Sequence, residues 1–184
     1  SIKDPIVKIW SECHPRFVGS HPMAGTEQSG VNSGIEGLFE NNTWVATPNE
    51  KTDTEALEKI HQLATSLRSK WIITETRMHD EAVALISHLP VFISTCLLST
   101  VASEKDREIL QLATILASRG FADTSRVGGG NPSLGTAMAR NNKREIIECL
   151  KLYQVNLKRL ESKIIQEDWE GLNAELKKTQ HLRP

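Results

Sequence analysis

Hydrophobic and polar positions alternate over short distances in the first third of the chain. Three runs rich in β-branched or aromatic residues lie between polar or turn-forming segments: 16–20 (RFVGS), 43–47 (TWVAT) and 70–74 (KWIIT). Runs of this length and composition predict β-strands.

The segment between the second and third runs has the spacing of an amphipathic helix. Thr52 and Glu55 fit a capping box at its start. One face of the helix carries Leu57, Ile60, Leu63, Ala64 and Leu67. A helix between two strands predicts a crossover, and therefore parallel strands. Three strands with one helix bury little surface, so we expect them to be the last strands of a larger α/β sheet.

From Met78 onward the pattern is helical. Asp80 is predicted to cap a long apolar helix, which Pro90 should kink. The next helix is predicted to open at Ser103 and to end before Gly120. The segment 121–132 (FADTSRVGGGNP) is dense in Gly, Asp, Ser and Asn and predicts a loop.

The last third predicts two more helices. Asn142 and Glu145 can cap the first of them, and a shorter helix should run over 168–178. The first helix carries a heptad seam at Ile146, Leu150, Tyr153, Leu157, Leu160 and Ile164. The composition changes near 76–80, which predicts an α/β part over 1–77 and a helical domain over 78–184. The predicted fold class is mainly α with a short α/β part.

One segment tests whether the chain is soluble. Residues 82–102 contain no Asp, Glu, Lys or Arg over 21 positions, which is long enough to cross a bilayer. They also contain a histidine, a proline and several Ser and Thr side chains that would be costly in hydrocarbon. We therefore favour a helix buried inside a soluble protein or dimer, and expect no membrane partner.

Composition and charge narrow the function classes. The net charge is −1 and the pI is near 6.6, which excludes a generic nucleic-acid binder that needs a basic excess. The 3 cysteines are widely spaced and fit neither a disulfide framework nor a zinc site. The first ten residues carry three charges and do not resemble a signal peptide. We expect a cytoplasmic protein without a bound metal.

His21 is the first candidate for chemistry. It lies in 19–26 (GSHPMAGT), where a predicted strand ends in a turn bounded by Gly and Pro. Ligands of α/β proteins bind at such strand ends, and an imidazole can accept a proton from an alcohol near neutral pH. The alternative is a surface histidine in a tight turn.

Arg126 is the second candidate. It precedes three consecutive glycines, 128–130, and its guanidinium can bind a carboxylate or phosphate. The spacing matches neither a Walker loop nor a G-x-G-x-x-G turn. The alternative is a flexible connector in which Arg126 pairs with Asp123.

A third group contains His79, Asp80 and His88. The two histidines are nine positions apart and should face nearly opposite sides of a helix, which argues against a shared metal site. Asp80 could be a plain helix cap, and His88 in an apolar helix is more often a satisfied core residue than a ligand.

Taken in order, four segments resemble the prephenate/arogenate dehydrogenase family of tyrosine biosynthesis: 17–26 (FVGSHPMAGT), 79–80 (HD), 86–90 (ISHLP) and 120–132 (GFADTSRVGGGNP). The similarity is greatest to the cyanobacterial arogenate dehydrogenases. The resemblance implies the last strands of a Rossmann-like sheet followed by an all-helical dimerisation domain, and hence a homodimer. The uncharged helix over 82–102 and the heptad seam fit that role.

The resemblance also implies a reaction, the oxidative decarboxylation of arogenate or prephenate with hydride transfer to NADP or NAD. It implies His21 as the base on the 4-hydroxyl and Arg126 as the cation on the ring carboxylate. Ser1, in a Ser-Ile-Lys stretch, resembles a serine that assists at the same hydroxyl. Thr26 and Gln28 would flank the substrate pocket.

The sequence departs from the family in one respect, because no G-x-G-x-x-G turn occurs in it. We expect that most of the cofactor site lies outside this chain, and that the chain is a truncated product or a separately encoded remnant. The preference for NADP or NAD cannot be read. Asp123 is a candidate partner for the amine of arogenate by charge alone. The alternative function is a non-catalytic dimerisation or tyrosine-binding module.

Overall fold

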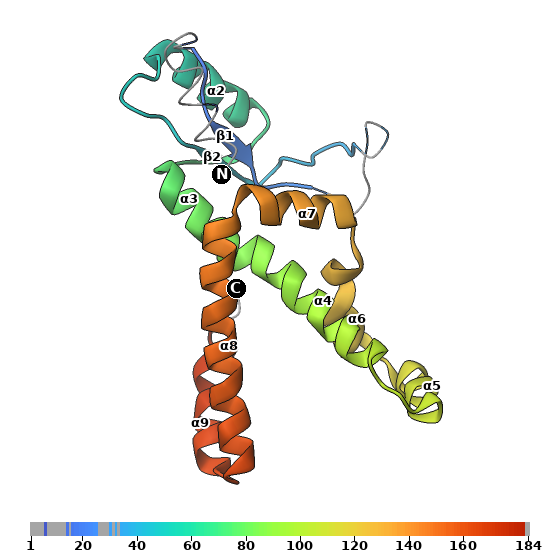
Figure 1. Ribbon diagram of the computed structural model, residues 1–184. Helices are drawn as coiled ribbons and strands as arrows, with labels where there is room; N and C mark the ends of the chain where they lie inside the picture. Colours follow the sequence, from blue (N-terminus) through green and yellow to red (C-terminus); the bar gives the residue numbers. More distant parts are fainter. Residues whose placement is uncertain are drawn as a thin grey trace.

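The computed structural model describes residues 34–182 and, before them, residues 6, 14, 16–25, 30 and 32. A small sheet with one helix occupies one end of the molecule, and the remaining helices extend away from it (Figure 1). The fold is therefore mainly helical with a short α/β part, as the sequence predicts.

The sheet has three strands in the order β1 (Ser20–Pro22), β2 (Thr43–Ala46) and β3 (Lys70–Ile73). β1 is antiparallel to β2, whereas β2 and β3 are parallel as the crossover predicts. The first strand starts later than the 16–20 run. Ser20 already pairs with Ala46, the last residue of β2, so residues before it lie beyond the end of their partner strand.

The crossover helix α2 (Thr54–Ser66) packs against β3. Its cap is Asp53, whose carboxylate accepts a hydrogen bond from the Ala56 amide at 2.7 Å. The predicted cap, Thr52, is wrong because its hydroxyl is bonded to Asn49 in the preceding turn. A carboxylate also suits the positive end of the helix dipole better than a hydroxyl does.

One long helix leads from the sheet into the helical part. It consists of α3 (Thr76–Val83), a π-helical segment η2 (Ala84–His88) and α4 (Leu89–Ala102). Asp80 lies within α3 and is not its cap, because the helix begins at Thr76, four residues before it. A π turn, η2, lies just before Pro90, where the proline ring and its missing N–H disturb the hydrogen-bond ladder. The kink predicted at Pro90 stays a prediction.

Three further helices and a 3₁₀ turn η3 (Arg126–Gly129) follow: α5 (Arg107–Leu116), α6 (Arg119–Ser125) and α7 (Pro132–Asn141). Asp106 caps α5, not Ser103. Gly120 lies inside α6, so it does not terminate the preceding helix. The predicted loop over 121–132 is largely helical because η3 and α6 pack against α4, which stabilises turns that glycine alone disfavours.

The chain ends with α8 (Lys143–Ile165) and α9 (Trp169–Gln180), which lie side by side and project from the molecule (Figure 1). Both helices were predicted. The structure shows in addition that Asp168 caps α9, because its carboxylate accepts a hydrogen bond from the Gly171 amide at 2.9 Å. Asn142 precedes α8 as predicted, but its side chain makes no capping bond and instead contacts the long helix.

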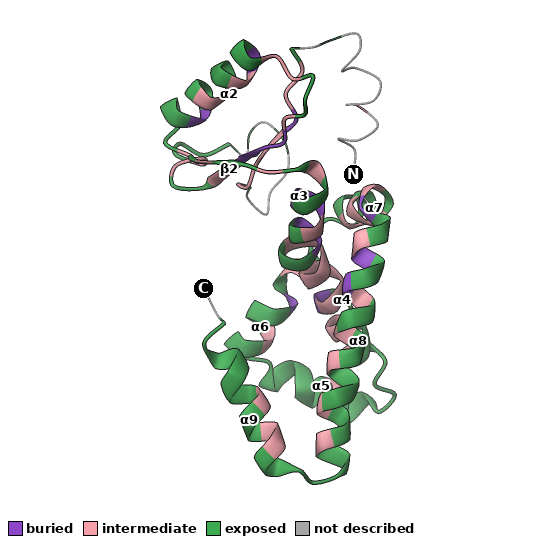
Figure 2. Ribbon diagram, turned by 90° about the vertical axis from the view of Figure 1, so that its left-hand side faces the viewer, coloured by how far each residue is buried: buried purple, intermediate pink, exposed green. Residues whose placement is uncertain are grey.

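The helical core lies where α8 crosses the long helix. Its buried centre is Ala84, Ile146 and Cys149. Farther along α8 the heptad positions are uncovered, and Leu157 and Ile164 are 52% and 53% exposed. Figure 2 shows the same exposure along α5, whose Ile115 and Leu116 face solvent.

Within the described residues, the helix over Thr76–Ala102 is also long and apolar enough to cross a membrane by length and composition. Only 17% of its most apolar window is buried within this chain. Its apolar face therefore extends well beyond what the single chain covers.

Candidate functional site

A cavity of about 460 Å³ opens between the sheet and the helical part. The sheet contributes residues of β1 and the segment before it, and the helical part contributes α3, η2, α7 and the start of α8. The polar side chains that line it are Ser20, His21, His79, Asp80, His88, Asn141 and Asn142. The cavity thus lies at the junction of the two predicted domains.

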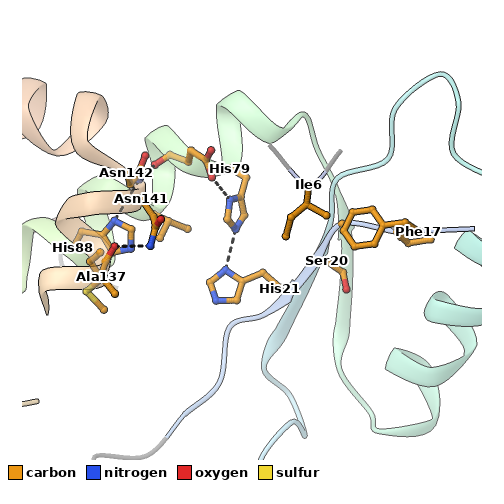
Figure 3. Close-up of a pocket in the computed structure, with 14 residues that line it drawn as sticks. Ile6, Phe17, Ser20, His21, His79, His88, Ala137, Asn141 and Asn142 are labelled. Atoms are coloured by element: carbon orange, nitrogen blue, oxygen red, sulfur yellow. Dashed lines mark hydrogen bonds and ion pairs between the residues drawn. The ribbon is translucent and has the colours of Figure 1, made fainter. Parts of the chain in front are cut away.

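Three side chains form a hydrogen-bonded chain at this cavity (Figure 3). His21 Nδ1 lies 3.0 Å from His79 Nε2, and His79 Nδ1 lies 2.9 Å from Asp80 Oδ1. The two rings meet edge to face, with centroids 5.2 Å apart. His79 and Asp80 are buried, whereas His21 is only partly buried and is the member nearest the sheet.

His21 is held by backbone pairing on both sides. It pairs with Val45 of β2, and the Met23 amide donates to the Thr43 carbonyl at 2.7 Å just beyond it. β1 has only 3 residues, and His21 is the middle one. It therefore belongs to the strand and also lies next to the turn that follows. This placement fits the predicted position at the mouth of the sheet.

His88 lines the same cavity as His79, so the prediction that they face opposite sides of the helix is wrong. The π turn contains more residues than an α turn and rotates the positions after it. The side-chain amide nitrogen of Asn142, Nδ2, donates to the Asp80 backbone carbonyl at 2.8 Å and lies 3.3 Å from His88 Nδ1. Burial lowers the pKa of His88, and nearby His79 adds to this, while Asp80 acts in the opposite direction.

Arg126 lines a second cavity, of about 940 Å³, between η2, α4, η3 and α7. Met138 of α7 lines both cavities, whereas the two predicted site residues, His21 and Arg126, line different ones. The turn that carries Arg126 is fixed to α4, because the Gly128 amide donates to Ser94 Oγ at 2.8 Å.

The other predicted site residues lie elsewhere. Asp123 is exposed on α6 and is not among the residues that line either cavity. Ser1, Thr26 and Gln28 lie outside the described residues. Within the described part of the chain, no group of three or more His, Cys, Asp or Glu side chains could hold a metal ion.

Sequence reasoning missed the roles of His79 and Asn142 at this site. Their partners are 58 and 62 positions away, His21 and the Asp80 carbonyl respectively, so no local pattern reports the contacts. The adjacent pair His79 and Asp80 is a local signal for the contact between these two side chains, but the prediction of Asp80 as a helix cap does not use it.

Family models match nearly the whole chain. Residues 1–73 match the prephenate dehydrogenase nucleotide-binding domain, and residues 75–178 match the prephenate dehydrogenase dimerization domain. The chain belongs to the prephenate dehydrogenase family. Its cavity with His21 lies where these two matched segments meet.

Two solved structures and one relative found by sequence agree with this assignment. The arogenate dehydrogenase of Synechocystis is 43% identical, with a TM-score of 0.86 over 98% of this chain and 63% of that one. The prephenate dehydrogenase of A. aeolicus, solved with hydroxyphenyl propionate and NAD+, is 26% identical, with a TM-score of 0.88 over 97% and 62%. A prephenate dehydrogenase of Bacillus subtilis is 29% identical over 94% of this chain and 47% of its own length. The chain therefore spans about half to three-fifths of the length of these family members.

Proposed function

We propose that this chain carries the substrate site of an arogenate or prephenate dehydrogenase of tyrosine biosynthesis. The observation that carries the proposal is the partly buried His21 at a cavity shared by the segments matching the nucleotide-binding and dimerization domains. An oxidation that couples a nicotinamide to a ring substrate needs a proton acceptor at that junction.

His21 acts on the 4-hydroxyl of the cyclohexadiene ring. As hydride leaves the ring carbon that bears this hydroxyl, the hydroxyl proton passes to the imidazole and a carbonyl forms. Loss of the ring carboxylate as CO₂ then returns its electron pair to the ring, and the oxygen takes the proton back as the ring becomes aromatic. The imidazole is unchanged over the cycle, as a general acid–base catalyst must be.

Arg126 binds the ring carboxylate in this proposal. A guanidinium offers two parallel N–H donors to a carboxylate. The side chain lines the neighbouring cavity, and among the described residues only Met138 lines both cavities. We propose that the substrate reaches from one cavity to the other past this flexible side chain. Ser1, Thr26 and Gln28 complete the proposed pocket by resemblance, with Asp123 as a candidate for the amine of arogenate.

The nicotinamide cofactor supplies the hydride acceptor when it is bound. The nucleotide-binding match over residues 1–73 supports NAD or NADP as this cofactor. The sequence contains no G-x-G-x-x-G turn. In this proposal the residues named in this chain act on the substrate.

We further propose a cytoplasmic homodimer. The match to a dimerization domain supports the homodimer, as do the apolar side chains of η2, α5 and α8 that the single chain leaves exposed. An exposed apolar surface of this extent is typical of a protein interface.

The test combines binding with turnover. Calorimetry of the 184-residue chain should show binding of 3-(4-hydroxyphenyl)propionate, and the Arg126→Ala variant should bind it more weakly. Turnover is followed at 340 nm with arogenate and with prephenate, using NAD+ and NADP+, with and without an added nucleotide-binding half from a relative. Turnover in either mixture supports the dehydrogenase. Binding of tyrosine with no turnover in any mixture would instead favour the tyrosine-binding module.

A further inference from the structure

We propose that His79, held by Asp80, is a positioning residue that fixes His21 in the tautomer with its proton on Nδ1 and its lone pair on Nε2. The catalytic consequence of this proposal rests on the function proposed above. The tautomer itself is a property of this chain and can be measured separately.

The order of donors and acceptors follows from Asp80. An ionised carboxylate can only accept hydrogen bonds, so His79 Nδ1, at 2.9 Å from Asp80 Oδ1, must carry a proton. A neutral His79 then has its lone pair on Nε2. His21 Nδ1, at 3.0 Å from that atom, must in turn be the donor, which leaves the lone pair of a neutral His21 on Nε2.

The fold holds both ends of the hydrogen-bonded series His21–His79–Asp80. His79 and Asp80 are adjacent on the rigid helix α3, and the Asn142 side chain ties the Asp80 carbonyl to the start of α8 at 2.8 Å. His21 is fixed by the pairing of β1 with β2. The His21–His79 bond is therefore a direct polar link between the sheet and the helical part, and it aligns the ring of His21 relative to both.

Burial separates the roles of the two histidines. His79 is 7% exposed and lies behind His21, whereas His21 is partly exposed at the cavity. A doubly protonated His79 would donate from Nε2 and force the opposite tautomer on His21, so the neutral form is the one that leaves His21 able to accept a proton on Nε2.

The tautomer can be observed by long-range ¹H–¹⁵N correlation spectra of the ¹⁵N-labelled 184-residue chain. The signals of His21 are assigned from their loss in the His21→Asn variant. In the unmodified chain above the pKa of His21, its Nδ1 should have the shift of a protonated nitrogen and Nε2 that of an unprotonated one. The opposite pattern, or an even mixture, would overturn the proposal without any variant at position 79.

Variants at position 79 test whether His79 is what fixes the tautomer of His21. His79→Leu removes the acceptor and should convert His21 to a mixture of tautomers, whereas His79→Gln retains a carbonyl acceptor and should restore much of the single tautomer. His61→Gln is the matched control, because His61 lies on α2 and stacks on Trp71. It should leave the His21 signals unchanged. An unchanged His21 tautomer in a folded His79→Leu chain would also overturn the proposal.

Kinetics distinguish this proposal from the proposed function. In a turnover-competent mixture, His79→Leu should lower kcat roughly 10- to 100-fold with little change in KM, as for residues that orient a catalytic histidine, and His79→Gln should recover most of the loss. Full activity in His79→Leu would refute the positioning role while the dehydrogenase stands. A single tautomer in a chain that shows no turnover in any mixture would refute the dehydrogenase while the positioning of His21 stands.

Discussion

Gly128 is the point where the turn that carries Arg126 touches α4, and adding one methyl group there should separate them. A Cβ at this position would lie 2.4 Å from the Ser94 carbonyl carbon and 2.5 Å from the Thr95 amide nitrogen. Both are backbone atoms of a helix and cannot rotate away. The Gly128→Ala variant must therefore move η3 or distort α4.

The cost can be estimated from two effects. Overpacking against backbone costs about 1–3 kcal/mol, and losing the Gly128–Ser94 hydrogen bond costs about 0.5–1.5 kcal/mol more. Ser94 is buried at 2% exposure, and its hydroxyl also donates to the Thr124 carbonyl at 2.8 Å, so the disturbance should reach α6. We expect a loss of about 2–4 kcal/mol, which is a fall in Tm of roughly 5–15 °C for a chain of this size.

Gly129→Ala is the matched control. It adds the same methyl group one residue along the turn, where nothing lies within 4 Å of the new atom. We expect a change of less than about 0.5 kcal/mol, typical of an open surface position. Both variants are compared by urea unfolding. The affinity for 3-(4-hydroxyphenyl)propionate is compared only between the Gly128→Ala variant and the unmodified chain, because Gly129 itself lines the cavity beside Arg126. Equal stability of the two variants would refute the argument that contact with α4 positions this turn.

Three further predictions follow from the site. His21→Asn should abolish turnover in a competent mixture while leaving the far-UV circular dichroism unchanged, and residual turnover near the unmodified level would exclude His21 as the base. Arg126→Ala should raise KM by roughly 30-fold, or about 2 kcal/mol, because it removes hydrogen bonds to a charged carboxylate; a change confined to kcat would contradict a binding role. Because burial lowers the pKa of His88 in the folded chain, the unfolded state takes up a proton more readily, so stability should fall as the pH drops below about 6.5. Urea unfolding between pH 5 and 8 tests this, and His88→Asn should make the curve flatter over that range.

Prediction from the sequence succeeded for the segments with a clear hydrophobic period. α2, α8 and α9 formed where apolar positions recur at helical spacing, and β2 and β3 are parallel because a helix connects them. Local patterns succeed here because each element buries one face that its own sequence defines.

Predictions failed where a distant contact replaced a local preference. The 121–132 segment reads as a loop from its glycines, but α6 and η3 are helical because they pack against α4. Position 128 requires a glycine because its backbone approaches Ser94 and Thr95 closely, and not because the segment is a flexible connector. Asp80 looked like a helix cap, yet its carboxylate contacts His79 inside α3.

The sequence by itself determined the family, most of the order of the elements and the candidate residues His21 and Arg126, because motifs and periodicity are written in neighbouring positions. The helices α6 and α7 were not predicted. The tertiary structure decided which side chains meet. Folding brings His79 to His21 across 58 positions, and the π turn places His88 in the same cavity. The packing of α7 and η3 also places Arg126 in a different cavity from His21, and Met138 lines both cavities. Such contacts depend on how elements pack against one another and on the phase of a helix, and no local run of sequence fixes either.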